Sequence, residues 1–129
     1  MTEQRTFYDL GRQQQSILEV VWGSGGASVR KVWDHLSPDH KLAYTSVLSA
    51  MQKLERMGWL RHRRQARSYV YTAAHPRAEA TLDASRKFVQ RVYGGDVFKM
   101  MRQLLTDPDT RAGSRPSLRT LVELRHSAA

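Results

Sequence analysis

The stretch "AYTSVLSAMQKLERMGWLRHRRQARSYVY", residues 43–71, changes its pattern halfway along. In its first half, Val47, Met51 and Leu54 recur at intervals of four and three residues, which is the spacing of an amphipathic helix. Gly58 follows as a residue suited to end a helix. We therefore predict a helix over residues 44–57.

The second half of this stretch has the alternation of strands. Residues 59–64 read "WLRHRR" and residues 68–73 read "SYVYTA", with Tyr69 and Tyr71 on one face and Val70 on the other. The four residues "QARS" at 65–68, of which Ser68 also begins the second run, are short enough for a hairpin loop. A basic hairpin is therefore expected directly after the helix.

Two shorter helices are expected before this stretch. The first spans about residues 11–22, where "ILEVVW" supplies an apolar stripe and "GSGGAS" ends it. The second is "VRKVWDHL" at 29–36, which Ser28 can cap. The segment "SPDHKLA" at 37–43 contains a proline and no apolar period, so it is expected to form a turn.

The remainder of the chain is also predicted to be mainly helical. Pro76 can open a helix over about 76–93, which Gly94-Gly95 would end, and Asp96 can cap "VFKMMRQLL" at 97–105. The polar segment 106–116 is expected to be a linker, and residues 117–126 are a candidate for a last short helix.

Three short helices followed by a hairpin are the element order of a winged helix-turn-helix, whose third helix enters the major groove of DNA. The predicted fold class is mainly α with a small antiparallel hairpin. The predicted domains are a winged-helix DNA-binding domain over 1–75 and a helical dimerisation region over 76–129.

The outward face of the predicted third helix has a composition suited to reading bases. It carries Thr45, Ser49, Gln52 and Arg56 opposite the apolar stripe, and Ser46 and Lys53 flank them. Small hydroxyls let a helix approach base edges, glutamine can pair with adenine, and lysine or arginine can reach guanine or phosphate. The alternative is an ordinary solvated helix face.

The hairpin supplies positive charge for phosphates. Residues 41–75 contain seven lysines and arginines against one acidic residue, so this stretch carries most of the net charge of +9. Arginines on a projecting loop can neutralise phosphates and release counterions. The hairpin arginines are Arg61, Arg63, Arg64 and Arg67. Basic hairpins also bind RNA, and a protein-docking winged helix is a further alternative.

The aromatic residues have a mainly structural interpretation. Trp22, Trp33 and Trp59 are expected to fill the core between the helices and the hairpin. Tyr44 has two open roles, which are to lie against DNA at the start of the third helix or to pack on Leu48.

The sequence gives little support for catalysis or for a bound cofactor. The 5 histidines lack metalloprotease spacing, cysteine is absent, and no phosphate-binding glycine loop occurs. We therefore expect no enzyme, metal or cofactor. The chain also lacks an apolar run of about 20 residues and a signal-peptide pattern, so a soluble cytoplasmic protein is expected.

The apolar stripes of the two later helices indicate self-association. Some 50 residues rarely form a stable core alone, so a second copy of the chain is the expected partner. The residues predicted to form this interface are Phe88, Val89, Val92, Phe98, Met101 and Leu105. The alternative is that these helices fold back on the winged helix of a monomer.

Several segments resemble the penicillinase-repressor family of bacterial regulators, also called the BlaI/MecI family. They are "LGRQQQSILEVVW", "ASVRKVWDHL", "LAYTSVLSAMQKLERMGWL", "RRQARSYVYTA" and "KFVQRVYGGDVFKMMRQLL". The likeness covers about residues 10–105, and residues 42–60 are its most specific part.

The resemblance implies a homodimeric transcriptional repressor that binds double-stranded DNA at inverted repeats of a TACA/TGTA kind. It gives a major-groove role to Tyr44, Thr45, Ser46, Ser49, Gln52 and Lys53. The hairpin residues 61–69 correspond to the wing, which contacts the DNA backbone, and Arg63, Arg64 and Arg67 match its basic residues. Family members cut by a sensor's protease carry an Asn-Phe bond in the fifth helix, where Leu104-Leu105 is the nearest match in this chain. Copper-responsive relatives end in a cysteine cluster, which this sequence lacks.

Overall fold

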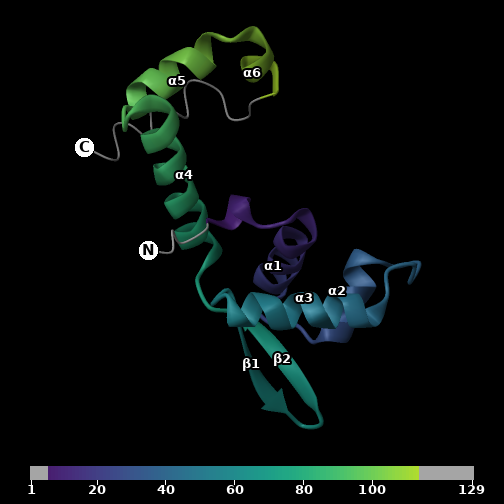
Figure 1. Cartoon of the computed structure of the whole chain (residues 1–129). Helices are drawn as coiled ribbons and strands as arrows, with labels where there is room; N and C mark the ends of the chain where they lie inside the picture. Colours follow the sequence, from purple (N-terminus) through teal and green to yellow (C-terminus); the bar gives the residue numbers. More distant parts are fainter. Residues whose placement is uncertain (1–5, 114–129) are drawn as a thin grey trace. The chain divides into compact units, whose positions relative to one another are not determined.

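A computed structural model describes residues 6–113 of the chain (Figure 1). These residues are mainly helical and contain one antiparallel hairpin, so the predicted fold class is confirmed. The elements follow one another as η1 (a 3-10 turn, Phe7–Asp9), α1 (Arg12–Ser24), α2 (Val29–Leu36), α3 (Tyr44–Arg56), β1 (Leu60–Gln65), β2 (Ser68–Ala73), α4 (Arg77–Tyr93), α5 (Val97–Thr106) and α6 (Pro108–Gly113).

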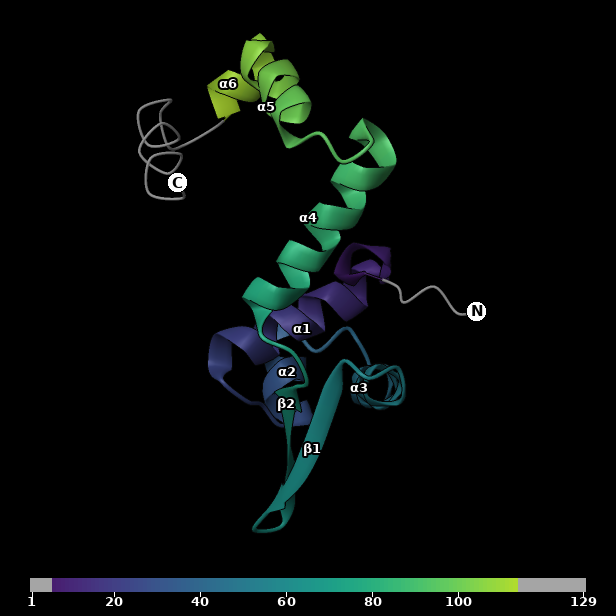
Figure 2. The ribbon, with the colours of Figure 1, turned by 90° about the vertical axis from the view of Figure 1, so that its left-hand side faces the viewer.

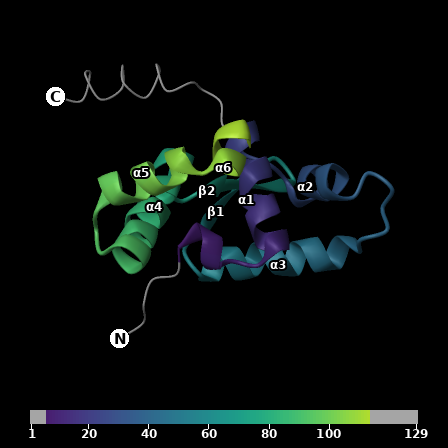
Figure 3. The ribbon, with the colours of Figure 1, turned by 90° about the horizontal axis from the view of Figure 1, so that it is seen from above.

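The predicted helix ends rest on local hydrogen bonds. Ser28 caps α2 because its hydroxyl accepts a bond of 3.1 Å from the backbone N–H of Lys31. Asp96 caps α5 in the same way, through a bond of 3.0 Å from Lys99. Gly58 follows the end of α3 with a φ of 88°, a left-handed conformation that favours glycine. Figure 3 shows the long turn that joins α2 to α3.

The hairpin has a shorter loop than the sequence predicted. Gln65 pairs with Ser68 as the last rung of the ladder, so Ala66 and Arg67 alone form the loop. The predicted four-residue loop "QARS" is therefore wrong, because its outer residues continue the two strands. Figure 2 shows β1 and β2 side by side along this hairpin.

The base of the hairpin is joined to the loop between α1 and α2. Ala27 and Tyr71 exchange two backbone hydrogen bonds of 2.9 Å each, so Ala27 forms a short bridge on the free edge of β2. Next to the base of the hairpin, the N–H of Ala74 donates to the carbonyl of Trp59 at 2.9 Å. The two strands are thus held where they leave the helices.

One apolar core lies between the first three α-helices and the base of the hairpin. Its largest fully buried side chains are Ile17, Leu18, Val21, Val32, Val47, Met51, Leu54 and Leu60. The three tryptophans pack against this core and are half-buried, so they line its edge and do not fill its centre. Two of them use their indole N–H at this edge: Trp22 donates to the carbonyl of His75 at 2.8 Å and Trp33 to that of Leu42 at 2.7 Å.

Contacts divide the chain into two compact units, one ending at Ser85 and the other beginning at Arg86. The first unit thus takes in the start of α4, where Ala80 and Ala84 are buried and Arg77 forms an ion pair with Glu19. The domain boundary that we predicted from the sequence, between residues 75 and 76, lies ten residues before this division.

The predicted linker is partly helical. Pro108–Gly113 form α6, which packs on α5 and begins where Asp107 accepts a hydrogen bond of 3.0 Å from the N–H of Thr110. The linker prediction over 106–116 is therefore wrong for these residues, because proline suits the first turn of a helix and aspartate caps it. The candidate helix at 117–126 lies outside the described residues.

Within residues 6–113, no helix combines the length and the apolar character needed to cross a lipid bilayer.

Candidate functional site

The predicted reading face of α3 lies open on the surface. Val47, Met51 and Leu54 are fully buried, and the opposite side of the same helix is exposed. The exposed residues include Thr45, Ser46, Ser49, Gln52, Lys53 and Arg56. Hydroxyl, amide and cationic groups are therefore accessible together along a helix of 13 residues.

A groove of about 670 Å³ runs between α3 and the hairpin. It brings together three of the predicted site residues, Tyr44, Gln52 and Arg67. The structure adds residues that the sequence did not single out for the site: Ser28, Arg30, Leu48, Glu55, His62 and Ser68 also line it. The groove thus joins one side of the reading face to the tip of the hairpin.

The hairpin arginines point to both faces of the two strands. Residues directly opposite each other in an antiparallel pair share a face. Arg64 is paired with Tyr69 and lies on the face of the buried Tyr71, whereas Arg63 is paired with Val70 on the other face. All the residues from Arg61 to Tyr69 are exposed. Arg63 and Arg64 can therefore contact a ligand only from different sides of the wing.

A hydrogen-bonded contact between His62 and Glu55 connects α3 to β1 within the groove. Nδ1 of His62 contacts both carboxylate oxygens of Glu55, at 2.7 Å from Oε2. The His62 ring also lies against two tyrosines, edge-on to Tyr69 with ring centroids 5.1 Å apart and tilted against Tyr71 at 5.6 Å. This pair joins the helix and the hairpin that carry the predicted contacts.

Tyr71 is a buried residue that lines the groove. Burial raises the pKa of its hydroxyl above the ordinary value, and the nearby carboxylate of Glu55 raises the pKa further. The hydroxyl therefore stays protonated at neutral pH, and Tyr71 adds no negative charge to the groove.

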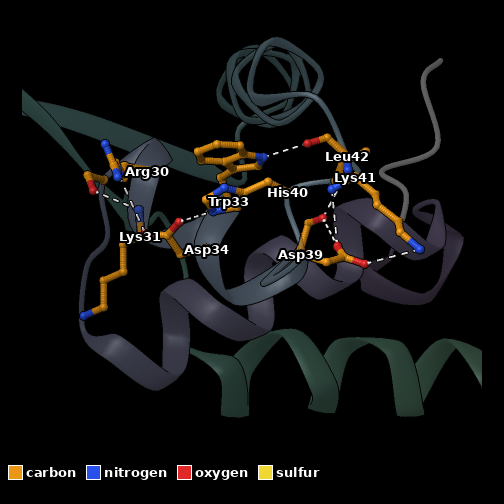
Figure 4. A network of polar contacts seen from close by, with 10 residues as sticks. Arg30, Lys31, Trp33, Asp34, Asp39, His40, Lys41 and Leu42 are labelled. Atoms are coloured by element: carbon orange, nitrogen blue, oxygen red, sulfur yellow. Dashed lines mark hydrogen bonds and ion pairs between the residues drawn. The ribbon is translucent and has the colours of Figure 1, made fainter.

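The start of α3 is held by an aromatic cluster. Tyr44 packs edge-on against Trp33 with ring centroids 5.6 Å apart and is still 41% exposed. On Trp33 the His40 ring stacks at 3.9 Å, and its Nε2 is 3.0 Å from the carboxylate of Asp34 (Figure 4). Tyr44 thus has a packing partner in Trp33 and retains an exposed edge.

The carboxylate of Asp39 orders the turn before α3. It accepts hydrogen bonds from the N–H of Lys41 at 3.3 Å and the hydroxyl of Ser37 at 3.0 Å, and these bonds lower its pKa below the ordinary value (Figure 4). The hydroxyl oxygen of Ser37 in turn accepts a bond from the N–H of Leu42 at 3.1 Å. The turn is therefore fixed by side chains as well as by its backbone.

The predicted interface residues of α4 and α5 differ in exposure. Phe88, Val92 and Phe98 are 44%, 53% and 67% exposed. Met101 and Leu105 are half-buried, whereas Val89 is 7% exposed and already packs within its own chain. An apolar surface thus remains on both helices without Val89.

Comparison with known proteins gives two kinds of likeness. A family model described as "Penicillinase repressor" matches residues 10–124. Proteins described as "Transcriptional regulator BlaI" from two strains of Mycobacterium tuberculosis are 28% identical to the chain over 125 residues, covering 83% of it and 90% of their own length.

Among solved structures, the complex structure of hsRosR-S1 matches 95% of the chain and 96% of its own chain, with a TM-score of 0.54 and 17% identity. A crystal structure of an ArsR family transcriptional regulator covers 67% of the chain and 84% of its own, with a TM-score of 0.47 and 17% identity. At this identity the likeness to hsRosR-S1 concerns the fold alone.

Proposed function

Because the chain belongs to the penicillinase repressor family, we propose that it represses transcription as a homodimer, with α3 in the major groove of operator DNA and the wing on the backbone. Membership of this family makes the chain a DNA-binding transcriptional regulator with a winged-helix fold and not an enzyme. The proposal concerns how this chain engages DNA.

The observation that carries the proposal is the exposed polar face of α3 beside a groove that ends at Arg67. A helix whose outward side bears Thr45, Ser49 and Gln52 can approach base edges, since these side chains are short or able to form paired hydrogen bonds. Phosphate contacts position a protein on the duplex, and base contacts give it specificity. In this proposal α3 has the second role and the hairpin has the first.

The wing arginines have separate places in this arrangement. Arg67 lines the groove beside α3, and Arg64 lies on the same face of the hairpin as Tyr71, so both are suited to phosphates next to α3. Arg63 lies on the other face of the hairpin and is suited to a neighbouring phosphate of the flanking DNA. Both arrangements place positive charge near the polyanion and make affinity depend on salt.

The exposed apolar residues of α4 and α5 support the proposed homodimer. Phe98 and Val92 are each more than half exposed, which is unfavourable unless another surface covers them. A two-fold dimer would place two copies of α3 about one turn of DNA apart, on an inverted repeat. The resemblance suggests half-sites of the TACA/TGTA kind, and DNA as the ligand implies a cytoplasmic site of action.

A mobility-shift experiment tests this function directly. A duplex with a TACA/TGTA inverted repeat, a scrambled duplex and a structured RNA are titrated with the full chain at equal salt. We expect the tightest binding to the inverted repeat. Preference for the RNA would favour the alternative of an RNA-binding winged helix. Sequencing of the genomic DNA bound by the protein would then identify the operator.

A further inference from the structure

Glu55 places a negative charge in the groove that is proposed to receive DNA phosphates. It is the only acidic residue of the stretch 41–75, and among the described residues that line the groove it is the only carboxylate. Its side chain is 29% exposed, so its charge is partly open to the groove. An unneutralised carboxylate in that position would repel the DNA backbone.

His62 is placed to cancel this charge. Its ring is held between Tyr69 and Tyr71, and its Nδ1 faces both oxygens of Glu55. An ionised carboxylate only accepts hydrogen bonds, so Nδ1 must carry a hydrogen. The remaining variable is the proton on Nε2. With that proton the pair of side chains is neutral, and without it the pair carries one negative charge.

We propose that His62 is a positioning residue for DNA binding: as a cation it neutralises and holds the Glu55 carboxylate, so that the groove accepts the phosphate backbone. This inference rests on the proposed DNA-binding function. It predicts that the bound complex favours the protonated His62, so binding takes up protons and weakens as the pH rises. Such a proton uptake is a property of binding that a purely structural contact would not show.

The other ionisable groups around His62 do not compensate in the same pH range. Tyrosines and arginines keep their charge state between about pH 6 and 8.5, where histidine titrates. These neighbours, taken over every element that lines the groove, are Tyr44 on α3, Arg30 on α2, Arg64 on β1, Arg67 in the loop, and Tyr69 and Tyr71 on β2. Arg30 also lies 3.8 Å from the carboxylate of Asp34.

The test measures the dissociation constant of the full chain for the inverted-repeat duplex between about pH 6 and 8.5 at constant salt. Affinity of the wild type should fall by about two- to fivefold across this range, the size expected for one partly exposed charge pair. Calorimetry in two buffers of different ionisation enthalpy should show net proton uptake on binding near neutral pH.

Two variants separate neutralisation from simple support. His62→Asn keeps an N–H donor at the position of Nδ1 and cannot become a cation, so its affinity should be independent of pH and equal to that of the wild type at high pH. Glu55→Gln keeps an acceptor for His62 and removes the negative charge. At high pH it should bind at least as tightly as the wild type does at low pH.

His75→Gln is the matched control, because His75 also faces a carboxylate, with Nδ1 3.5 Å from Glu79, and does not line the groove. It should keep the wild-type pH profile. The inference is overturned if the wild type shows no pH dependence, if His62→Asn retains it, or if Glu55→Gln gains nothing at high pH. If His62→Asn fails to fold by circular dichroism, the result with Glu55→Gln decides.

Failure of this inference is distinguishable from failure of the proposed function. Sequence-specific DNA binding with an unchanged pH profile in His62→Asn overturns only the role of His62. Absence of specific DNA binding at every pH overturns the proposed function and this inference with it.

Discussion

The indole Nε1 of Trp33 donates a hydrogen bond of 2.7 Å to the backbone carbonyl of Leu42, across the turn that joins α2 to α3. This bond fixes the point at which α3 begins, because Leu42 lies two residues before Tyr44. The same indole ring packs against Tyr44. Trp33 therefore holds the turn before α3 and packs against Tyr44, the first predicted DNA contact of the helix.

Replacing Trp33 with Phe should weaken both folding and operator binding. The carbonyl of Leu42 loses its donor, and the free energy of unfolding should fall by about 1–2 kcal/mol. Trp22→Phe is the matched control, since it removes a similar indole bond of 2.8 Å to His75 away from this turn. Urea unfolding and operator titration of both variants test this. Equal loss of operator affinity in the two folded variants would contradict the role given to Trp33.

Gln52→Ala and Arg67→Ala should alter DNA binding in different ways. Loss of a base contact by Gln52 should reduce discrimination by roughly 1–3 kcal/mol and leave binding to scrambled DNA nearly unchanged. Loss of Arg67 should weaken both DNAs and lower the slope of log K against log salt concentration by about one unit. Titrations at several salt concentrations check this. A Gln52→Ala variant that weakens both DNAs equally would show that Gln52 does not read bases.

A charge on the exposed apolar surface of α5 should prevent dimerisation. Phe98→Glu places a carboxylate at a side chain that is 67% exposed in the single chain and is proposed to be covered by a second copy. Sedimentation should show a dimer for the wild type at micromolar concentration and a monomer for the variant. Gln103→Glu adds the same charge to an exposed polar position of α5 and should remain dimeric. A monomeric wild type would refute the proposed interface.

The hairpin loop should be stabilised by glycine. Ala66 has a φ of 55°, which is unfavourable for a residue with a side chain, and it is the first of two loop residues. Ala66→Gly should raise the free energy of unfolding by about 0.5–1 kcal/mol, and the branched side chain of Ala66→Val should lower it. Thermal unfolding of both variants gives the sign. A destabilised Ala66→Gly would mean that the loop has another conformation.

Asp39 should contribute a part of stability that disappears in acid. Its hydrogen bonds lower its pKa in the folded chain, so this contribution is complete above the unfolded value of about 3.9 and is lost as the pH falls through the lower folded value. Asp39→Asn should therefore be less stable than the wild type at pH 6, and the difference should shrink below about pH 4. Urea unfolding over this range tests the sign. A difference that is independent of pH would contradict it.

The sequence was sufficient for the parts of the fold that depend on local pattern. Ser28 and Asp96 were predicted as caps and act as caps, because an N-cap is decided by residues within one turn. The exposed face of α3 was also predicted, since the buried Val47, Met51 and Leu54 fix the opposite side of the helix. The roles of its outward residues in DNA binding remain predictions.

The parts that were missed depend on contacts between elements or on ambiguous composition. The pair of Glu55 and His62 arises because the start of β1 packs against the end of α3, a contact that no local spacing reveals. Residues 108–113 read as a linker because proline, aspartate and glycine are as common in turns as at helix ends. Asp107 followed by Pro108 was the available signal for a helix start.

The backbone bridge between Ala27 and Tyr71 has an evolutionary consequence. It secures the hairpin at its base, whereas residues 61–69 are all exposed and take no part in the core. Substitutions near the tip can therefore accumulate with little effect on folding while they alter contacts with whatever lies alongside. Related chains can in this way change the contacts proposed between the end of the wing and the DNA backbone and keep the scaffold that carries it.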